Sequence, residues 1–580
     1  MLEVVGLPID EELLRGWRSR LERARSHLHW TESAAMARRH AGGVSLALAA
    51  PCDQLFLATE INEWALCATL QQRDPARWQS LAADMLAAAL ADAADPACVL
   101  PPVLSEAEAL ARFDQLAARE ARPQLRALLA QADARGLPHL LDDSELTLGA
   151  GSGGRTFALA ALPAAAGIGW QELHGIPTVL VTGSNGKTTT VRLLAACARA
   201  HGWHVAYNCT DGVFIDGETL ASGDYSGPAG TRRVLRERRT EAAILETARG
   251  GILRRGIAVS RADVAVVTNI SADHFGEYGI HDLAGLADAK LTVGALLDER
   301  GLLVLNADDP QLRARAASLP QRFARVPRTG WFALDAGSPE LQAYHSAGAP
   351  TCGVQDGRLL LRRDDRSDDL GAVESMPLTI GGAACYNIAN LAAAALAAAA
   401  LGIAPATIAA VAARFGADPG DNPGRLMRYD YGGAQVLVDY AHNPEGLRGL
   451  LRVAVHLQRR SGGRIGLLLG HAGNRQDEDI EQLAGVAARF RPDLVVVKEN
   501  EAHLRGRAAG EIPRIIHAAL LRHGMPGTAL AMRNTELEAA RCALDWARPG
   551  DVLALPVHSQ AARAAVLGLL APPPAPPPAA

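Results

Sequence analysis

The sequence predicts an α/β protein in which two α/β domains follow a lead domain of mixed or mainly helical character. Short β-branched runs alternate with helical segments between residues 166 and about 415, and the same alternation returns after residue 425. Residues 1–165 instead carry apolar helical patterns, for example over 104–134, and few β-rich runs. Runs that are apolar throughout indicate strands buried on both faces, as in doubly wound parallel sheets covered by helices.

Length and composition fit several domains and exclude some classes of protein. The chain has 580 residues, and at roughly 100–200 residues per domain this corresponds to about three to five domains. The formal charge of −5, from 58 Lys+Arg and 63 Asp+Glu, is too balanced for binding nucleic acid or an anionic membrane by bulk charge. Hydrophobic residues make up 49% and charged residues 21%, which excludes global disorder. Alanine runs such as 391–400 favour closely packed helices.

The sequence also predicts a cytoplasmic protein. Its most apolar long stretch, 391–404, is dominated by alanine and too short to span a membrane. The N-terminal residues MLEVVGLPIDEELLRG lack the basic-then-apolar order of a signal peptide. The eight cysteines are scattered without a C-x-x-C pair, so neither a zinc site nor a disulfide framework is expected.

The elements divide the chain into four segments: a lead domain at 1–165, a central domain at 166–416, a C-terminal domain at 417–571 and a Pro/Ala tail at 572–580. The lead domain ends in a glycine cluster, and a Gly, Pro, Asp and Asn-rich loop opens the C-terminal domain as a hinge. The tail PPPAPPPAA has the composition of a polyproline-like segment. Buried strands are predicted in the central domain at 177–183, 241–247, 262–270 and 301–308. In the C-terminal domain they are predicted at 434–440, 463–470, 493–500 and 551–557.

The strongest motif is a phosphate-binding loop between the first of these strands and a helix. Such a turn directs backbone N–H groups and the positive end of the helix dipole at one point. Lys187 can reach the β- and γ-phosphates of a nucleoside triphosphate, and the hydroxyl of Thr188 can bind Mg²⁺. The pattern is the shortened G-x-x-G-K-T, and a chance glycine-rich turn is the alternative. The predicted loop residues are Gly183, Ser184, Asn185, Gly186, Lys187, Thr188 and Thr189.

The variant TGSNGKTTT resembles the loop of the Mur ligases, the ATP-dependent amide-forming family that includes the folylpolyglutamate synthetases. Further motifs follow in the family's order over about 170–560: LETARGG, T-N-x-x-x-D-H, LNADDP, YNIAN, NPGR and VDYAHNPEG. The resemblance implies a P-loop Mur-ligase central domain, a Rossmann-like C-terminal domain, and ATP and Mg²⁺ as cofactors. It also implies a catalytic set of Lys187, His274 and Lys290.

Each residue matched to the family has a role that the resemblance implies and a plainer alternative. Glu246 would bind Mg²⁺ with Thr188, or pair with a nearby arginine; His274 would hold a second metal ion, or be a cap or core histidine. Lys290 falls where many members carry a carbamylated lysine, and an ordinary surface lysine is the alternative. Nucleotide contacts are implied for Asn306, Asn387, Arg425 and Asp439, with turn or cap roles as the alternatives for Asn306, Asn387 and Asp439.

Within the family, the chain is similar to the Mur-ligase half of the cyanophycin synthetases, which attaches arginine to the side-chain carboxylate of an aspartate backbone. The likeness lies in residues 211–235, 245–256, 422–444, 474–480 and 505–512, and in LFLATEINEWAL of the lead domain. The ATP-grasp domain of those enzymes is expected to be absent, because the lead domain shows no second nucleotide signature. Two departures are Tyr386 in place of the family's histidine, which weakens that contact, and LPVHSQ in place of a lysine-containing end loop.

Substrate contacts are predicted from charge. Arg249, Arg254 and Arg255 can grip carboxylates, although a solvated basic loop is equally consistent with the sequence. His442 and Asn443 are further substrate candidates. The acidic run at 477–479 is either a solvated face or a site near a cationic amine such as arginine.

These motifs predict an ATP- and Mg²⁺-dependent amide (isopeptide) ligase. It would join an amino-acid amine to a peptide or polymer carboxylate, as in the addition of arginine to aspartyl side chains. One alternative is a Mur-type ligase for an unrelated peptide. Another is a weakly catalytic nucleotide-binding partner of a full-length cyanophycin synthetase. Neither nucleic acid nor membrane is an expected partner, and a homo-oligomer or an association with a cyanophycin synthetase is left open.

Overall fold

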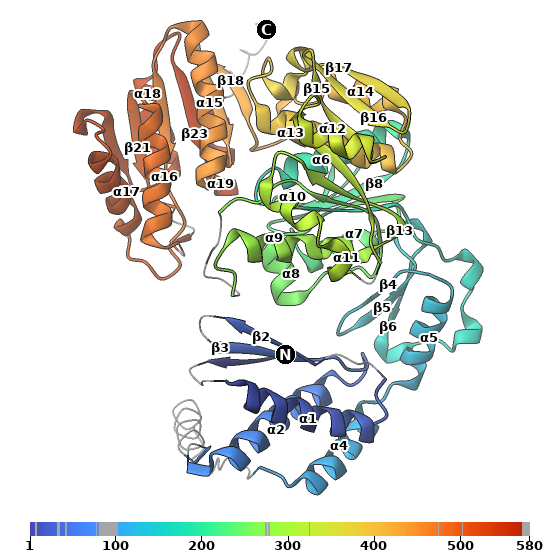
Figure 1. Ribbon diagram of the computed structural model, residues 1–580. Helices are drawn as coiled ribbons and strands as arrows, with labels where there is room; N and C mark the ends of the chain where they lie inside the picture. The colour runs from blue at the N-terminus through green and yellow to red at the C-terminus, as the bar shows by residue number, and fades with distance from the viewer. Residues whose placement is uncertain are drawn as a thin grey trace, which may run out of the picture.

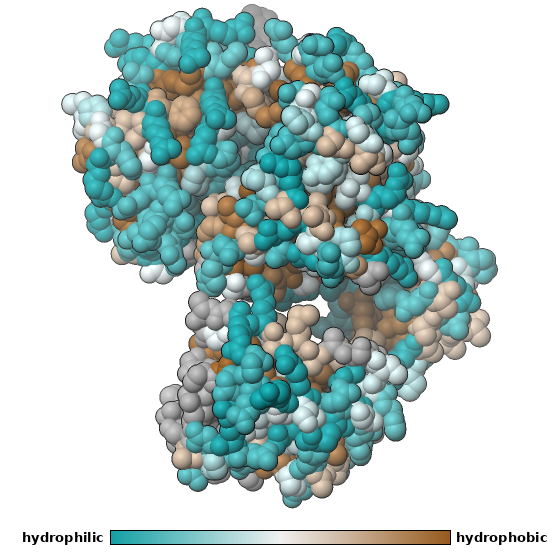
Figure 2. Space-filling model, in the orientation of Figure 1, coloured by the Kyte–Doolittle hydropathy of each residue, from teal (hydrophilic) through white to brown (hydrophobic). Residues whose placement is uncertain are grey.

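The structure is a computed structural model, and it describes the chain except for residues 6–8, 32–34, 41–42, 77, 80–102, 273–274, 276–278, 324, 474, 501–502 and 571–580. Three parts follow one another along the chain (Figure 1). The N-terminal part, in blue, lies at one end of the central domain, in green to yellow, and the C-terminal domain, in orange to red, lies at its side. Hydrophilic side chains cover much of the face in Figure 2, which is hollowed where the N-terminal part meets the rest.

The N-terminal part contains two small antiparallel sheets, of strand orders β1-β3-β2 and β4-β5-β6. Helices pack on the first sheet around Trp17, whose indole N–H donates to Asn62 Oδ1 at 2.8 Å. The second sheet is tied to the central domain, where Arg236 pairs with Asp142 at 2.6 Å. The elements are β1 (Leu2–Val5), α1 (Glu11–His27), β2 (Ala35–His40), β3 (Gly43–Leu48), α2 (Leu55–Arg73), α4 (Glu106–Glu120), α5 (Pro123–Ala134), β4 (His139–Leu141), β5 (Glu145–Leu148) and β6 (Arg155–Ala158).

The central domain is built on an eleven-stranded sheet of order β10-β9-β8-β11-β7-β12-β13-β14-β15-β16-β17. Its seven inner strands, β8 to β15 in that order, are parallel, whereas β9 and β10 at one edge and β16 and β17 at the other are antiparallel. The strands are β7 (Thr178–Thr182), β8 (Val205–Cys209), β9 (Gly212–Ile215), β10 (Glu218–Ser222), β11 (Ala242–Glu246), β12 (Ala262–Val267), β13 (Leu297–Asn306), β14 (Arg328–Asp335), β15 (Thr351–Gln355), β16 (Arg358–Arg363) and β17 (Arg366–Ala372).

Helices cover both faces of this sheet, in two separate hydrophobic clusters. On one face the alanine-rich helix α13 (Cys385–Ala400) packs against α6 (Lys187–His201), and its run of alanines is buried. Small side chains let the two helices approach closely, as the composition predicts. The remaining helices are α7 (Pro228–Arg236), α8 (Arg249–Arg255), α9 (Leu283–Leu291), α10 (Pro310–Ala316), α11 (Leu319–Arg322), α12 (Pro339–Ser346) and α14 (Pro405–Ala412).

The C-terminal domain has a six-stranded sheet of order β18-β19-β23-β20-β21-β22, parallel except for β18. Helices again cover both faces (Figure 1). Its elements are β18 (Met427–Tyr431), β19 (Ala434–Asp439), α15 (Pro444–Ser461), β20 (Ile465–Leu469), α16 (Asp477–Phe490), β21 (Leu494–Lys498), α17 (Glu511–Arg522), β22 (Leu530–Arg533), α18 (Glu536–Trp546), β23 (Val552–Pro556) and α19 (Gln560–Leu570).

The α/β prediction is confirmed, and all eight predicted strands are parallel strands of the two sheets. The prediction of a simple doubly wound sheet misses the antiparallel hairpins at both edges of the central sheet. Two of these hairpins turn at Asp-Gly pairs, 216–217 and 356–357, in which both residues have positive φ. That dipeptide is a strong local signal for a hairpin.

Three further expectations concern membrane-spanning segments, the cysteines and the Pro/Ala tail. No helix in the described part of the chain is long and apolar enough to cross a membrane. The cysteines among the described residues are free thiols, and Cys98 lies outside them. The Pro/Ala tail predicted at 572–580 also lies outside the described residues.

Candidate active site

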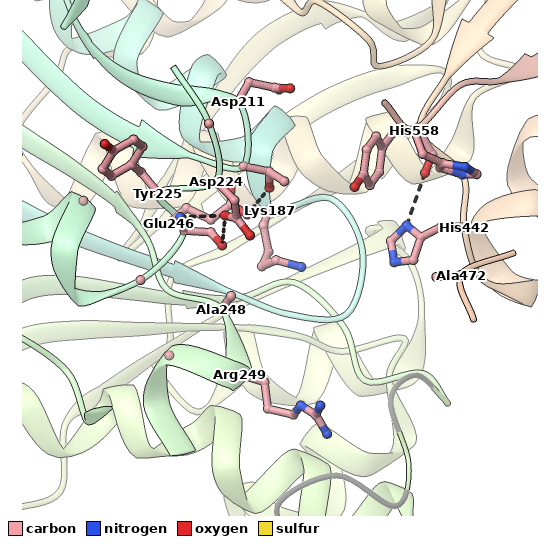
Figure 3. A pocket seen from close by; sticks show the side chains of 18 of the residues that line it. Lys187, Asp211, Asp224, Tyr225, Glu246, Ala248, Arg249, His442, Ala472 and His558 are labelled. Atoms are coloured by element: carbon pink, nitrogen blue, oxygen red, sulfur yellow. Dashed lines mark hydrogen bonds between the residues drawn. The ribbon is translucent and has the colours of Figure 1, made fainter. Parts of the chain in front are cut away.

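Two cavities meet at the phosphate loop, between the central and C-terminal domains. The larger has a volume of about 790 Å³ and the smaller about 320 Å³. In the larger cavity, Lys187 and Glu246 lie on the central-domain wall, and His442 and His558 on the facing wall (Figure 3). A ligand in one cavity would therefore touch a ligand in the other. The residues that line both are Ser184, Lys187, Thr210, Glu246, Tyr440 and His442.

The phosphate loop takes its shape from two glycines. Gly183 follows β7 with φ +147°, and Gly186 caps α6 with φ +84°. A Cβ at Gly183 would lie 1.8 Å from Thr268 Oγ1, and one at Gly186 would lie 2.2 Å from Asn390 Oδ1. Only glycine fits both the conformation and the space. The ammonium of Lys187 folds back on the loop and donates to the carbonyls of Gly183 and Ser184, at 3.0 Å each.

Glu246 ends β11 and is fully buried beside the first turn of α6. Its carboxylate accepts hydrogen bonds from the hydroxyls of Thr188, at 2.8 Å, and Thr210, at 3.1 Å. These hard oxygen donors fit Mg²⁺, which is held by one or two carboxylates together with substrate phosphates. Among the described residues no three His, Cys, Asp or Glu side chains form a metal cage. The residues therefore fit a Mg²⁺ site that has few protein ligands.

Thr268 and Asn269, the T-N pair predicted after β12, form hydrogen bonds with the phosphate loop. Asn269 Oδ1 accepts from the N–H of Asn185 at 2.9 Å, and its Nδ2 donates to the carbonyl of Asn185 at 3.1 Å. The hydroxyl of Thr268 donates to the same carbonyl at 2.6 Å. His274, predicted to bind a second metal ion, lies outside the described residues, so its role stays a prediction.

Lys290 lies near the end of α9 and is 4% exposed, so it is not a surface lysine. Its ammonium donates to the carbonyl of Gly183 at 2.9 Å, and the side chain lines the larger cavity. The structure thus brings Lys290 to the phosphate loop from a helix about 100 residues away in the sequence.

The predicted adenine contacts line the smaller cavity. The amide of Asn306 donates to the carbonyl of Thr268, and that of Asn387 to the carbonyl of Leu378, both at 3.0 Å. Tyr386, which departs from the family's histidine, lines the same cavity, and its buried hydroxyl has no hydrogen-bond partner within the described structure. Burial, and secondarily the charge of Asp439, raises the pKa of Tyr386 well above its usual value, so the hydroxyl stays protonated and can donate.

The loop 439–443 of the C-terminal domain faces the phosphate loop. The carboxylate of Asp439 accepts from the N–H groups of Leu426 and Ala441, both at 2.7 Å. Burial raises the pKa of Asp439, against the effect of Arg425. The guanidinium of Arg425 stacks over the ring of Tyr440 at 4.3 Å. Arg425 and Asp439 both line the smaller cavity, as expected for residues that reach a nucleotide from this domain.

Asn443 does not line either cavity. Its Oδ1 caps α15 by accepting from Gly446 N at 2.9 Å, and its Nδ2 donates to Asn185 Oδ1 at 2.9 Å. The structure therefore places Asn443 as a direct link between the C-terminal domain and the phosphate loop. His442, the other substrate candidate beside it, lies where the two cavities join.

A second link between the domains is centred on Asp211, which sequence reasoning missed. Asp211 follows β8 and pairs with Arg192 of α6 at 2.8 Å and with Arg563 of α19. Arg425 Nη2 approaches the same carboxylate at 3.9 Å. Although burial opposes it, the three guanidinium groups hold the pKa of Asp211 below its usual value. No local pattern marks this aspartate, because its partners lie far along the chain.

Basic and imidazole side chains outnumber the three carboxylates, Asp211, Asp224 and Glu246, in the lining of the larger cavity. Arg249, at the start of α8, is buried, whereas Arg254 and Arg255 are exposed at the helix end. The acidic run at 477–479 does not line either cavity: it forms the first turn of α16, where Asp477 pairs with Arg507 at 2.7 Å. The lysine, arginine and histidine residues of the lining are Lys187, Arg249, Arg254, Arg255, Lys290, His442, His471, Arg475, His503, Arg505 and His558.

Two family models match the central and C-terminal parts of the chain. The family model described as the Mur ligase middle domain matches residues 181–349, and that of the Mur ligase, glutamate ligase domain matches residues 424–555. The chain is 35% identical over 370 residues to a cyanophycin synthetase of Synechocystis sp., covering 64% of this chain and 41% of that protein. It thus spans about two fifths of the length of that relative.

Two further comparisons cover more of the other protein. A UDP-N-acetylmuramoyl-L-alanyl-D-glutamate–2,6-diaminopimelate ligase of Geobacter metallireducens is 29% identical, over 68% of this chain and 76% of that protein. Among solved structures, the Mycobacterium tuberculosis folylpolyglutamate synthase complexed with ADP is 17% identical. That match covers 69% of this chain and 91% of the other, with a TM-score of 0.49.

Proposed function

Because this chain belongs to the Mur ligase family of ATP-dependent amide ligases, we propose that it joins a carboxylate of an acidic peptide or polymer to the amine of an amino acid. One observation carries the proposal: the two cavities share the wall formed by Lys187, Glu246 and Thr210. A triphosphate in the smaller cavity would present its γ-phosphate to a carboxylate in the larger one at that wall.

The proposed reaction has two steps. A carboxylate oxygen attacks the γ-phosphorus of ATP, and ADP leaves, which gives an acyl phosphate. The amine then attacks the acyl carbon, and inorganic phosphate leaves as the amide forms and the amine loses a proton to solvent or a nearby base. Each step needs positioning and charge stabilisation more than covalent help from the protein.

Lys187 is placed to act in the first step. Two anions must approach each other there, and an ammonium between them reduces their repulsion and stabilises the charge on the transferring phosphoryl group. The two carbonyls that Lys187 contacts are weak partners, so the ammonium can turn to phosphate oxygens when a nucleotide binds. Mg²⁺ held by Thr188 and Glu246 would supply further charge neutralisation on the phosphates.

The C-terminal domain would exclude water from the acyl phosphate. Asn443 joins the phosphate loop directly, and Asp211 binds arginines of both domains. These contacts hold the cleft closed over the junction of the cavities. Water exclusion matters because hydrolysis of the acyl phosphate is the competing reaction.

The charge of the larger cavity favours an acidic acceptor. Arg249, Arg254 and Arg255 lie on one wall, and guanidinium groups bind carboxylates with two parallel hydrogen bonds. The similarity to cyanophycin synthetases narrows the proposal to the addition of arginine to aspartyl side chains. An acceptor peptide unrelated to cyanophycin is the second candidate, supported by the match to the Geobacter diaminopimelate ligase over three quarters of its length.

A direct test measures amino-acid-dependent ADP release by the full chain. The protein is incubated with ATP, Mg²⁺, single amino acids and acidic acceptors, including β-aspartyl peptides and polyaspartate, and products are identified by mass. A product heavier than the acceptor by the amino acid minus water is expected. Nucleotide binding without any product would favour a weakly catalytic partner of a full-length cyanophycin synthetase.

The matched variants are Lys187→Met and Arg358→Met. Loss of the ammonium at the junction is expected to reduce turnover by about 100- to 1000-fold without unfolding the protein. Arg358 lies on the exposed edge hairpin, paired with Asp369, so its loss should leave turnover unchanged. Equal activity of the two variants would refute the role of the phosphate loop.

A further inference from the structure

Lysine is rare in this chain, and its few positions are informative. The sequence holds three lysines, Lys187, Lys290 and Lys498, against 55 arginines among the 58 basic residues. Two of them belong to the phosphate-loop site described above. The third, Lys498, was not identified from the sequence and lies at the end of β21 in the C-terminal domain.

Lys498 is fully buried, with 0% of its side chain exposed. A buried ammonium is costly unless it is paired and hydrogen-bonded. Its Nζ pairs with Glu536, which is 1% exposed and opens helix α18, and it lies 3.3 Å from His558 Nδ1. Space for the stem is provided by Gly470, where a Cβ would come within 2.8 Å of Lys498 Cγ.

Glu536 is the centre of this group. Its carboxylate also accepts from the backbone N–H groups of His558, at 3.0 Å, and Ser559, at 2.8 Å. Its place in the first turn of α18 adds the positive end of the helix dipole. Although burial opposes it, the charge of Lys498 and the hydrogen bond from the backbone N–H of His558 hold the pKa of Glu536 well below its usual range. The ion pair thus fixes the backbone of the loop that follows β23.

His558 carries the effect of the ion pair to the cleft. Its Nε2 lies 3.2 Å from the carbonyl of Ala441, and a carbonyl can only accept, so Nε2 carries the hydrogen. In the neutral ring, Nδ1 then accepts from the ammonium of Lys498. Burial and Lys498 lower the pKa of His558 to about 4, which keeps the ring neutral. Both ring nitrogens have hydrogen-bond partners. His558 therefore supports the neighbouring loop and is not available as a general base, although it lines the larger cavity.

The segment that His558 contacts is the loop 439–443. In addition to the bond to Ala441, the N–H of Val557 donates to the carbonyl of Asp439 at 2.9 Å. The same loop presents Asp439 to the smaller cavity and His442 to the junction, and Asn443 reaches Asn185 of the phosphate loop. A continuous series of contacts therefore connects the buried ion pair to the phosphate loop.

We propose that Lys498, Glu536 and His558 are positioning residues that set the loop 439–443 against the phosphate loop. This inference rests on the proposed function, because it assigns the loop to the nucleotide and acyl-transfer site. It predicts that the group affects catalysis through geometry, without contact with the reacting atoms.

The test compares His558→Leu with His558→Gln in the full chain. Leucine removes both ring contacts and leaves Lys498 paired with Glu536, whereas the glutamine amide can again donate to the carbonyl of Ala441. We expect His558→Leu to lower kcat by about 100-fold, the effect of a displacement of about 1 Å at a reacting centre. The KM for ATP should change far less, and His558→Gln should recover most of the loss. Unchanged kcat in His558→Leu, or no recovery in His558→Gln, would overturn the proposal.

Hydrogen exchange separates this inference from the proposed function. On addition of ADP and Mg²⁺, the wild-type loop 439–443 should gain protection, and His558→Leu should lose that gain while the phosphate loop keeps its own. This readout needs no amide product, so it holds even if no substrate pair is found. Equal protection of the loop in both proteins would refute the positioning role.

A second set of variants addresses stability. Lys498→Met leaves Glu536 buried and unpaired and is expected to destabilise the domain, whereas the double variant Lys498→Met/Glu536→Gln removes both charges. We expect the double variant to regain thermal stability but not kcat. Recovery of both together would make the group purely structural and overturn the proposal.

Discussion

The two walls of the cleft are organised differently. The central-domain wall includes Glu246 at the carboxyl end of β11, Thr210 just after β8 and Thr188 in the first turn of α6, and both hydroxyls donate to the carboxylate of Glu246. The C-terminal wall includes the loops after β19 and β23, which are joined to a buried ion pair from β21 and α18. The first wall is held by hydroxyl groups that donate to a carboxylate at the end of a central strand, and the second by a buried ion pair that lies behind the loops. The central-domain wall is suited to hold a phosphate, and the C-terminal wall is suited to position the loop that lies over that phosphate.

The largest expected effect comes from the central wall. Glu246→Gln keeps the size of the side chain and its hydrogen bonding to one hydroxyl, but removes the negative charge that would hold Mg²⁺. We expect kcat to fall by about 100- to 1000-fold, with a much higher Mg²⁺ concentration needed for half-maximal rate. ADP release measured over a Mg²⁺ titration checks this. An unaltered Mg²⁺ dependence would remove Glu246 from the metal site.

The link between the walls is tested by Asp211→Asn. The change leaves Arg192 and Arg563, which are 4% and 7% exposed, without their counter-charge. Removal of one partner from a buried ion pair is expected to cost about 3 kcal/mol. Thermal unfolding with and without ADP is the measurement, and Asp369→Asn on the exposed hairpin is the control. A similar small shift in both variants would show that Asp211 does not join the domains.

The C-terminal wall should make stability depend on pH. His558 has a pKa of about 4 in the folded protein against 6.5 when unfolded, so between pH 7 and 5 the unfolded chain binds a proton that the folded chain does not. The free energy of unfolding should therefore decrease as the pH is lowered, by about 2 kcal/mol between pH 7 and pH 5. The groups facing the ring are Lys498, Glu536, His442 and Tyr440, and Glu536 adds a further loss below its unfolded pKa of 4.5.

Denaturant unfolding at pH 7 and pH 5 checks this slope, with His558→Gln as the control. Because glutamine does not titrate, its stability should fall less over the same range. Identical slopes in the two proteins would assign the pH dependence to other groups, such as His503, whose pKa is also lowered by burial.

The smallest effect is expected at Tyr386. Its hydroxyl is buried and has no hydrogen-bond partner among the residues that the structure describes, so Tyr386→Phe should leave thermal stability unchanged or slightly higher. If the hydroxyl donates to the nucleotide, the affinity for ADP should fall by about 1 kcal/mol, or roughly fivefold. Calorimetric titration with ADP and Mg²⁺ measures this, and loss of stability with unchanged affinity would contradict it.

The same contrast explains what could be predicted from the sequence. The phosphate loop, Glu246 and the T-N pair are marked by short motifs beside buried strands, and the structure places them together at the cleft, whereas Thr210, which also bonds to Glu246, was missed. Lys290, Asn306 and Asn387 also lie at the cleft, although their roles remain predictions. Eight strands of the two sheets were predicted from apolar runs. Five others, β8, β14, β15, β18 and β22, were missed, as were the edge hairpins despite their Asp-Gly turns.

Asp211 and the group of Lys498, Glu536 and His558 could not be predicted in this way. Their partners are separated by 19 to 352 residues, and each alone has the appearance of an ordinary surface residue. A buried charge becomes recognisable only when the fold shows what surrounds it. The acidic run at 477–479 illustrates the opposite case, because its prominence in the sequence corresponds to a helix start outside both cavities.

The scarcity of lysine has a practical consequence. Positive surface charge in this protein is carried by arginine, and the amines of its three lysine side chains all lie in or beside the cleft. Amine-directed reagents, such as acetylating or carbamylating agents, would therefore act on a folded molecule mainly at Lys187 and Lys290, apart from the chain's amino terminus. A mass increase that nucleotide suppresses would report occupancy of the cleft directly, without any substrate being known.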